Sequence, residues 1–146
     1  MQTRKFRYLP HMADIAFVAY GKNLGEVLEN SALAMLGIMF DIQKIKKAKG
    51  SVKTMRITES ASSSEDMVWF ALQKIVSKVD EKGVSAFRFK VNRIVQGKNG
   101  ITLHGCIFYK RIAKYSALLD VKAVTPHGLE VKRTKGGYSA RVLVDV

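Results

Sequence analysis

Two carboxylate residues, one near each end of the chain, have the chemistry of metal ligands. Asp14 stands at the entrance to a stretch rich in β-forming residues, and Asp145 directly precedes Val146 and the terminal α-carboxylate. The side-chain carboxylate of Asp145 and the terminal α-carboxylate are so close on a final strand that they repel each other unless a cation lies between them. Hard divalent ions such as Ca²⁺ or Mg²⁺ prefer sites made of oxygen. The alternatives are ordinary, because an aspartate before a strand commonly caps a turn and chain ends commonly fray.

Two histidines and a lysine near the same segments are further candidates. His11 precedes Asp14, whereas Lys122 and His127 lie on either side of Pro126. His11, Asp14 and His127 could act as acid and base groups of a hydrolase or transferase, although no nucleophile accompanies them. The sequence has no Gly-rich phosphate loop, paired-histidine metalloprotease motif or nucleophile elbow. We therefore expect no catalytic residues, and ordinary surface positions are the alternative for the lysine and the second histidine.

Net charge is the strongest signal in the composition. Lys and Arg number 25 against 12 Asp and Glu, which gives +13 at pH 7. The excess is +4, +4 and +5 over residues 1–50, 51–100 and 101–146, so it is not confined to a tail. The densest basic run, residues 44–49, is predicted to be a solvated loop, with a nucleic-acid contact as the alternative. A field this positive attracts polyanions in a salt-dependent manner.

A basic RNA-binding module without a role at an active site is therefore one alternative function. Such modules combine cationic side chains with aromatic side chains on which bases stack. The residues that suggest it, all expected at the surface, are Tyr109, Lys110, Arg111, Lys114 and Tyr115.

Length and composition predict one globular domain spanning residues 1–146. A chain of this length with 47% hydrophobic residues can bury a core without disulfides. The single cysteine, Cys106, excludes an intramolecular disulfide and is expected to be a small core residue in a strand. No apolar run of about 18 residues and no apolar signal core is present. We therefore expect a soluble protein of the cytoplasm.

Two segments have the apolar periodicity of amphipathic helices. Residues 24–40 and 65–82 carry apolar side chains at i, i+3 and i+4 spacing, and the second segment carries lysines along its polar face. Serine or asparagine followed three residues later by glutamate marks a capping box, and glycine marks a helix end. The predicted capping residues are Asn23 with Glu26 for the first helix, and Ser62 with Glu65 and then Gly83 for the second.

The remaining segments are rich in β-branched and aromatic residues, which predicts strands. Asn99-Gly100 marks a hairpin whose loop is expected to exceed two residues, and residues 134–137 mark another. Helices inserted among hairpin-linked strands predict an α+β fold, in which two helices pack on a mixed, largely antiparallel sheet in the order β-α-β-α-β-β-β-β-β. The predicted strands are residues 14–20, 52–58, 87–92, 101–109, 118–125, 128–133 and 138–146.

Four short motifs together resemble the archease family over essentially the whole chain. Each is weak alone, but their order, their distances and the position of the last one make the set specific. The motif at residues 11–15 is similar to the family's His-Thr-Ala-Asp-Ile signature, and the motif at residues 121–125 is similar to its Val-Lys-Ala-Val-Thr block. In sequence order they are His11-Met12-Ala13-Asp14-Ile15; Ala19-Tyr20-Gly21 with Leu24, Glu26, Glu29, Asn30 and Ala32; Val121-Lys122-Ala123-Val124-Thr125 with His127 and Leu129-Glu130-Val131; and Leu143-Val144-Asp145-Val146.

The resemblance implies an archease-like fold and an accessory role in RNA processing. Archeases assist the GTP- and metal-dependent ligase that joins tRNA halves carrying a 2′,3′-cyclic or 3′-phosphate end. They promote guanylylation of the active-site histidine of the ligase and so allow repeated turnover, and contact with tRNA would be indirect. A chaperone-like or specificity-modulating role toward a tRNA cytosine methyltransferase is an alternative that the family also implies.

The resemblance also implies a divalent-metal site. Its ligands correspond to Asp14, Asp145 and the terminal carboxylate or carbonyl of Val146. Ca²⁺ is the expected ion, with Mg²⁺ and Mn²⁺ as alternatives. Lys122 is a further position implied to matter, and with His11 and His127 it is a candidate contact for a phosphate or for the partner protein.

Overall fold

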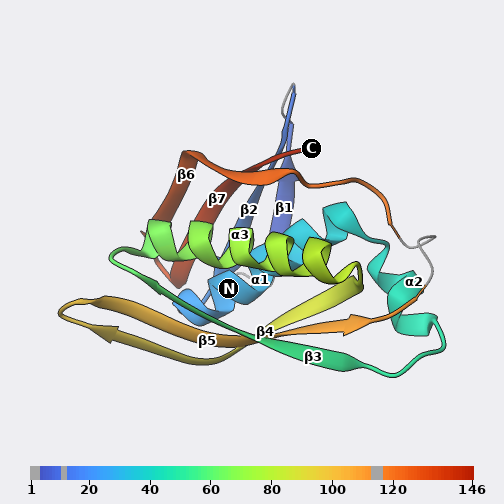
Figure 1. The fold of residues 1–146 in the computed structure, drawn as a ribbon. Coiled ribbons are helices and arrows are strands. Elements are labelled where there is room, and N and C mark those ends of the chain that lie inside the picture. Colours follow the sequence, from blue (N-terminus) through green and yellow to red (C-terminus); the bar gives the residue numbers. More distant parts are fainter. Residues whose placement is uncertain (1–3, 11–12, 113–116) are drawn as a thin grey trace.

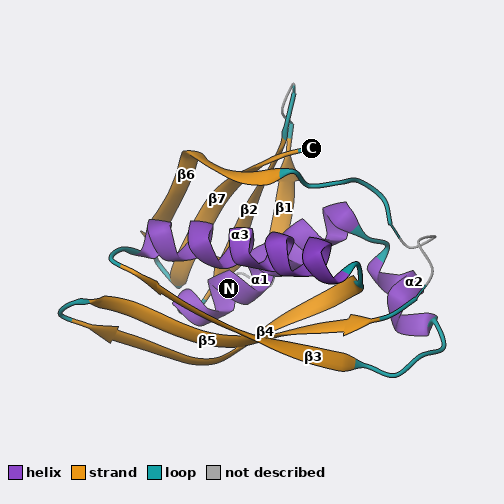
Figure 2. Ribbon diagram, in the orientation of Figure 1, coloured by secondary structure: helices purple, strands orange, loops and turns teal. Residues whose placement is uncertain are grey.

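A layer of helices lies between two antiparallel sheets in the computed structural model, which describes residues 4–10, 13–112 and 117–146 (Figure 1 and Figure 2). The first sheet has the strand order β1-β2-β7-β6, and the second has the order β3-β5-β4. The α+β fold class is therefore confirmed. In chain order the elements are β1 (Phe6–Leu9), β2 (Ile15–Gly21), α1 (Leu24–Met39), α2 (Ile42–Lys47), β3 (Lys53–Ala61), α3 (Ser64–Lys82), β4 (Ser85–Gly97), β5 (Gly100–Lys110), β6 (Ala123–Thr134) and β7 (Gly137–Asp145).

The two long helices form where the apolar periodicity predicts them. Asn23 caps α1, and its Oδ1 accepts a hydrogen bond from the Glu26 N–H at 2.9 Å. The cap of α3 is one residue later than predicted, because Ser63 rather than the preceding serine accepts from the Asp66 N–H, at 3.1 Å. Gly83 ends α3 at φ 64°, a left-handed conformation that glycine adopts readily. No helix in the described residues is long and apolar enough to cross a membrane.

Two short elements were not predicted. β1 adds an edge strand to the first sheet by pairing with β2, in a register that runs from Phe6 opposite Ala19 to Leu9 opposite Ala16. Residues 44–47 of the basic run expected as a loop belong to α2 (Ile42–Lys47) instead. Its cap is Asp41, whose Oδ1 accepts from a backbone N–H in the first turn at 3.2 Å.

The strands form two sheets rather than one, and every ladder between named strands is antiparallel rather than mixed. The predicted strands 118–125 and 128–133 form one strand, β6, from Ala123 on, and its register shifts between Thr125 and Glu130. The prediction of a strand over residues 118–122 is wrong. The turn between β4 and β5 is shorter than predicted, because Gly97 pairs with Gly100 and leaves two residues in the turn. The predicted hairpin between β6 and β7 is confirmed.

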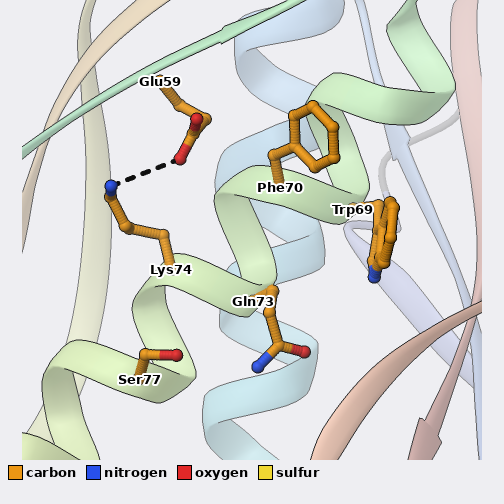
Figure 3. Close-up of a pocket in the computed structure, with 6 residues that line it drawn as sticks. All are labelled: Glu59, Trp69, Phe70, Gln73, Lys74 and Ser77. Carbon is orange, nitrogen blue, oxygen red and sulfur yellow. Dashed lines mark ion pairs between the residues drawn. The ribbon is translucent and has the colours of Figure 1, made fainter.

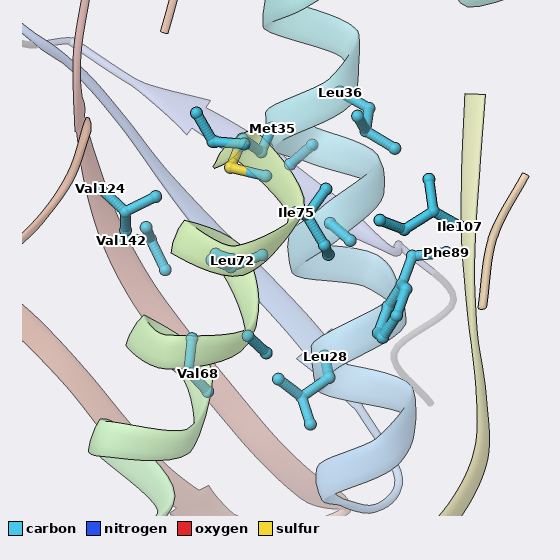
Figure 4. Close-up of a cluster of buried hydrophobic side chains, with 14 of the residues drawn as sticks. Leu28, Met35, Leu36, Val68, Leu72, Ile75, Phe89, Ile107, Val124 and Val142 are labelled. Carbon is cyan, nitrogen blue, oxygen red and sulfur yellow. The ribbon is translucent and has the colours of Figure 1, made fainter. Parts of the chain in front are cut away.

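The hydrophobic core fills the space between the helices and both sheets (Figure 4). Each buried aliphatic or aromatic side chain contributes roughly 1.5–3 kcal/mol relative to an exposed one. The helices therefore hold the sheets together rather than covering one of them. The labelled core residues are Leu28, Met35 and Leu36 of α1; Val68, Leu72 and Ile75 of α3; Phe89 and Ile107 of the second sheet; and Val124 and Val142 of the first.

Alternate residues of β5 point to opposite sides of the second sheet. Leu103 and Ile107 face the helices and are fully buried. Between them, Gly105 leaves room for the ring of Phe89, because a Cβ there would lie 2.5 Å from the Cζ of that ring. Cys106 points the other way, so the prediction of a core cysteine is wrong. It is half-buried on the face turned away from the helices.

Acidic helix side chains bind the outer edges of two edge strands. Glu29 of α1 accepts from the Val91 N–H of β4 through its Oε2 at 2.9 Å. Glu65 of α3 accepts from the Val131 N–H of β6 at 3.3 Å. An edge strand has backbone N–H groups without a strand partner, and these carboxylates satisfy two of them.

Hydrogen bonds from the Lys110 side chain connect α2 to the end of the second sheet. The residue is 5% exposed, and its Nζ donates to the carbonyl oxygens of Lys46 at 3.1 Å and Ala48 at 2.9 Å. These carbonyls belong to the C-terminal end of α2, where no further helical N–H groups follow to bind them. A single ammonium group thus binds two of the carbonyl groups at the end of this helix.

The hydroxyl of Ser31 is predicted to destabilise α1. It is buried and has no hydrogen-bond partner among the described residues. An unpaired buried hydroxyl costs roughly 1–3 kcal/mol, so Ser31→Ala should raise the free energy of unfolding by about 1 kcal/mol or more in urea denaturation. Ser77→Ala, at an exposed position of α3, controls for helix propensity. A gain no larger than that of this control would contradict the prediction.

Lys110→Met is predicted to lower the stability. The variant keeps an unbranched apolar side chain but leaves two carbonyl oxygens of α2 without their donor, which costs roughly 1–3 kcal/mol. Thermal or urea unfolding measures the change. Lys53→Met, at an exposed position of the neighbouring strand β3, is the matched control and should change stability by less than about 0.5 kcal/mol. Equal stabilities of the two variants would show that the two hydrogen bonds do not stabilise the fold.

Candidate functional site

One end of the first sheet gathers the predicted metal ligands. The register of β2 with β7 ends with Ile15 opposite Val144, so Asp14 and Asp145 are the next residues of the two segments at the same end of the sheet. Asp14 directly precedes β2, and Asp145 is the last residue of β7. In Figure 1 the C-terminus lies beside the ends of β1 and β2. The antiparallel pairing thus joins two carboxylates that are far apart in the sequence.

Lys122 lies at the same end of the sheet, on the other side of β7. Its N–H donates to the Asp145 carbonyl oxygen at 2.8 Å, and the following residue, Ala123, pairs with Asp145. Lys122 and Asp145 are exposed, whereas Asp14 is half-buried. We call Asp14, Lys122, Asp145 and Val146 together the carboxylate end.

The carboxylate end is anchored to the core. The side chains of Ile15 and Val146 are partly buried and pack against the hydrophobic cluster. β7 also pairs on both sides, with β2 and with β6, up to its last residues. The fraying that is common at chain ends is opposed here by packing and by backbone hydrogen bonds.

Two side chains of α3 hold the start of β6 next to the carboxylate end. The Val124 N–H donates to Gln73 Oε1 at 2.9 Å, and Trp69 Nε1 donates to the Val124 carbonyl at 2.8 Å. Trp69 and Gln73 are four residues apart and therefore lie on one face of the helix. Both backbone groups of Val124 are satisfied, which fixes the strand two residues away from Lys122.

Sequence reasoning missed this pair of side chains. The only signal was an indole and an amide at i, i+4 spacing on a helix, and that pattern is also typical of residues at an ordinary surface. Its meaning depends on which strand lies beside α3, which the sequence alone does not reveal.

Trp69 and Gln73 also line a pocket of about 310 Å³ between α3 and β3 (Figure 3). The rings of Trp69 and Phe70 lie 5.2 Å apart, and Lys74 Nζ lies 3.5 Å from Glu59 Oε2. The one hydroxyl in the lining, Ser77, has no histidine beside it there. The pocket thus offers an apolar wall and an ion pair rather than a set of acid and base groups.

The donor atoms of the carboxylate end suit a hard cation. Its oxygens are anionic, and neither thiolate nor imidazole is present among its residues, so the donor set fits Ca²⁺, Mg²⁺ or Mn²⁺ better than zinc. Within the described residues no group of three or more His, Cys, Asp or Glu side chains could hold a metal ion.

The acid–base trio considered for a hydrolase is not assembled in the described part of the chain. His11 lies outside the described residues. His127 lies in the irregular part of β6, beyond the pair of Thr125 with Leu143, and its N–H donates to Thr125 Oγ1 at 3.1 Å. The register therefore separates His127 from Asp14 and from the carboxylate end.

The residues that suggested a basic RNA-binding module are not the exposed set that was expected. Tyr109 is 4% exposed and Lys110 is 5% exposed, and Tyr115 and Lys114 lie outside the described residues. Arg111 is exposed. An aromatic surface for stacking centred on Tyr109 is therefore ruled out by burial.

Comparison with known proteins gives a consistent result. A sequence model of the archease protein family matches residues 6–146. Two relatives named "Protein archease" come from Methanosarcina mazei, 32% identical, and Methanosarcina acetivorans, 33% identical, and each match covers 99% of this chain and 98% of the relative.

Solved structures agree with this assignment. The solution structure of a protein from Methanobacterium thermoautotrophicum is 28% identical and has a TM-score of 0.84, with 97% of this chain and 99% of that chain covered. The crystal structure of an archease from Thermotoga maritima, described as a possible chaperone, shares the fold at a TM-score of 0.62 and 20% identity, with 100% and 99% covered. The chain is thus a member of the archease protein family.

Proposed function

We propose that this chain is an accessory protein that activates the GTP- and metal-dependent RNA ligase of tRNA splicing, by promoting guanylylation of the ligase and its repeated turnover. Family membership supports an accessory role. The observation that carries the finer proposal is the carboxylate end, where Asp14 and Asp145 follow the paired residues Ile15 and Val144 at one end of the sheet and Lys122 lies beside Asp145.

In this proposal, Asp14, Asp145 and the terminal carboxylate or carbonyl of Val146 hold one divalent ion, most simply Ca²⁺. When bound, the ion supplies positive charge that can neutralise phosphate oxygens. Asp14 and Asp145 come from different strands, so the sheet sets their separation before any ion arrives. Such preorganisation lowers the cost of binding.

Lys122 has a different role in the proposal. It is exposed and directly precedes β6 at this end of the sheet. An ammonium group there can contact a phosphate of GTP or a carboxylate of the ligase. The exposure of Lys122 and Asp145 suits contact with a second protein, because neither side chain has to be uncovered first.

The proposed ligands predict a loss of metal binding on neutralisation. Asp14→Asn and Asp145→Asn should each weaken Ca²⁺ or Mn²⁺ binding at least tenfold in titration calorimetry, about 1.4 kcal/mol, because each removes an anionic ligand. Glu130→Gln removes one exposed carboxylate from the same sheet and should leave the affinity unchanged. The assignment fails if the unmodified protein binds neither ion, or if both Asn variants keep its affinity.

The proposed activity predicts an effect on the ligase itself. Catalytic amounts of the unmodified protein should increase the fraction of ligase labelled by radioactive GTP and allow several ligations per ligase molecule. Asp145→Asn should lose most of this stimulation and Glu130→Gln should retain it, with circular dichroism confirming that both variants fold. If the unmodified protein changed neither labelling nor turnover, the proposed function would be wrong.

A further inference from the structure

The second sheet has one face packed against the helices and one face turned away from them. Register assigns the residues, because side chains of paired residues lie on the same face. Leu103 and Ile107 mark the covered face. The opposite side is called the outer face and consists of Thr54, Arg56, Thr58 and Ser60 of β3, Thr102, His104, Cys106 and Phe108 of β5, and Arg88, Lys90, Arg93 and Val95 of β4.

The outer face carries four cations and no carboxylate. Its cationic residues, all exposed, are Arg56, Arg88, Lys90 and Arg93. The single acidic residue in these three strands is Glu59, which lies opposite Leu103 on the covered side.

Two acidic side chains near this sheet already have partners. Glu59 forms an ion pair with Lys74 of α3 at 3.5 Å. Glu29, which reaches the edge of β4 from α1, accepts from the Val91 N–H. The positive charge of the outer face is therefore left to solvent or to a ligand.

The cations are spread over the sheet rather than gathered at one point. Arg56 and Lys90 both pair with Cys106, from opposite sides, so two strand spacings of about 4.8 Å separate them. Along β4, Arg88 and Lys90 lie two residues apart, a distance of roughly 6.6–6.8 Å. A single small anion cannot contact all four groups, whereas a chain of phosphates can.

The outer face also offers a surface for stacking and a set of hydroxyl groups. The guanidinium carbon of Arg88 lies 5.0 Å from the centre of the ring of Phe108, which is half-buried and lies 6.4 Å from the Phe87 ring. Aromatic rings and guanidinium planes are the groups on which unpaired bases stack. Thr58 Oγ1 lies 3.4 Å from His104 Nδ1, which adds polar groups of the kind that contact phosphates and sugars.

Basic residues continue beyond the sheet. Lys110 binds the carbonyls of Lys46 and Ala48, so the end of α2 is held at one end of β5. Lys46 and Lys47 of that helix are exposed. A polyanion lying on the outer face would meet further positive charge at this end.

We propose that the outer face binds single-stranded RNA, by phosphate contacts to its four cations and by base stacking at Arg88 and Phe108. The inference rests on the proposed function, since it names the substrate class that the accessory protein would hold for the ligase. In Figure 1 the second sheet and the carboxylate end lie on opposite sides of the helix layer. RNA on one side therefore leaves the other side free for the ligase.

The test measures binding of a fluorescein-labelled single-stranded RNA of mixed sequence by anisotropy at several salt concentrations. Replacing Arg88, Lys90 and Arg93 together by Gln should weaken binding about tenfold or more and reduce the slope of log affinity against log salt by about 2. The matched control replaces three exposed lysines elsewhere, Lys22, Lys132 and Lys135, by Gln. Equal losses for the two triple variants, or no RNA binding by the unmodified protein, would overturn the inference.

A second variant and a competitor separate RNA from acidic proteins. Phe108→Leu keeps every charge, so weaker RNA binding with an unchanged salt slope supports stacking. Polyglutamate at equal charge concentration should compete poorly, and equal competition would show a general polyanion surface and overturn the assignment to RNA. In a guanylylation assay that contains no RNA, the outer-face triple variant should stimulate the ligase normally. Failure of RNA binding and failure of the proposed function are thus read in different assays.

Discussion

The structure depends on how two open sheets satisfy the backbone groups of their edge strands. β4 and β6 each have one edge without a strand neighbour, and the helices between the sheets supply the missing partners. Glu29 binds β4, while Glu65, Gln73 and Trp69 bind β6. Each hydrogen bond also fixes a helix relative to a sheet, so the core forms between surfaces whose relative positions are already restricted. The hydrogen bonds of Gln73 and Trp69 also fix the start of β6, and therefore the position of Lys122 next to it.

Much of the fold could be predicted from local patterns, and the exceptions have physical reasons. The periodicity of α1 and α3 and the glycine at the end of α3 are properties of short stretches, and they were found. β1 was missed because four residues become a strand only when β2 lies beside them. α2 was missed because its lysines are typical of loops, whereas the stabilising contact comes from Lys110, far away in the sequence.

Some residues of the candidate site could be predicted from the sequence and others could not. Asp14, Asp145 and Lys122 were candidates from their residue types and positions, and the resemblance to a family strengthened that prediction. The register of the first sheet places these distant segments at one end of the sheet. Trp69 and Gln73 could not be identified, because their partner is a backbone position on another element. The charge of +13 had suggested Tyr109 and Lys110 as a binding surface, yet both are buried. The acidic end belongs to the first sheet and the basic outer face to the second, and composition alone does not show this separation.

The order of segments within the two sheets has a consequence for synthesis of the chain on the ribosome. The second sheet is built from β3, β4 and β5, which follow one another with only α3 between them, so its pairing can begin early. The first sheet is discontinuous, because β2 must wait for β7, and every helix and the whole second sheet are made in between. Late, non-local pairing of this kind is entropically slow. The β1–β2 hairpin therefore has an open edge until β7 has been made, and the carboxylate end can form only after that step.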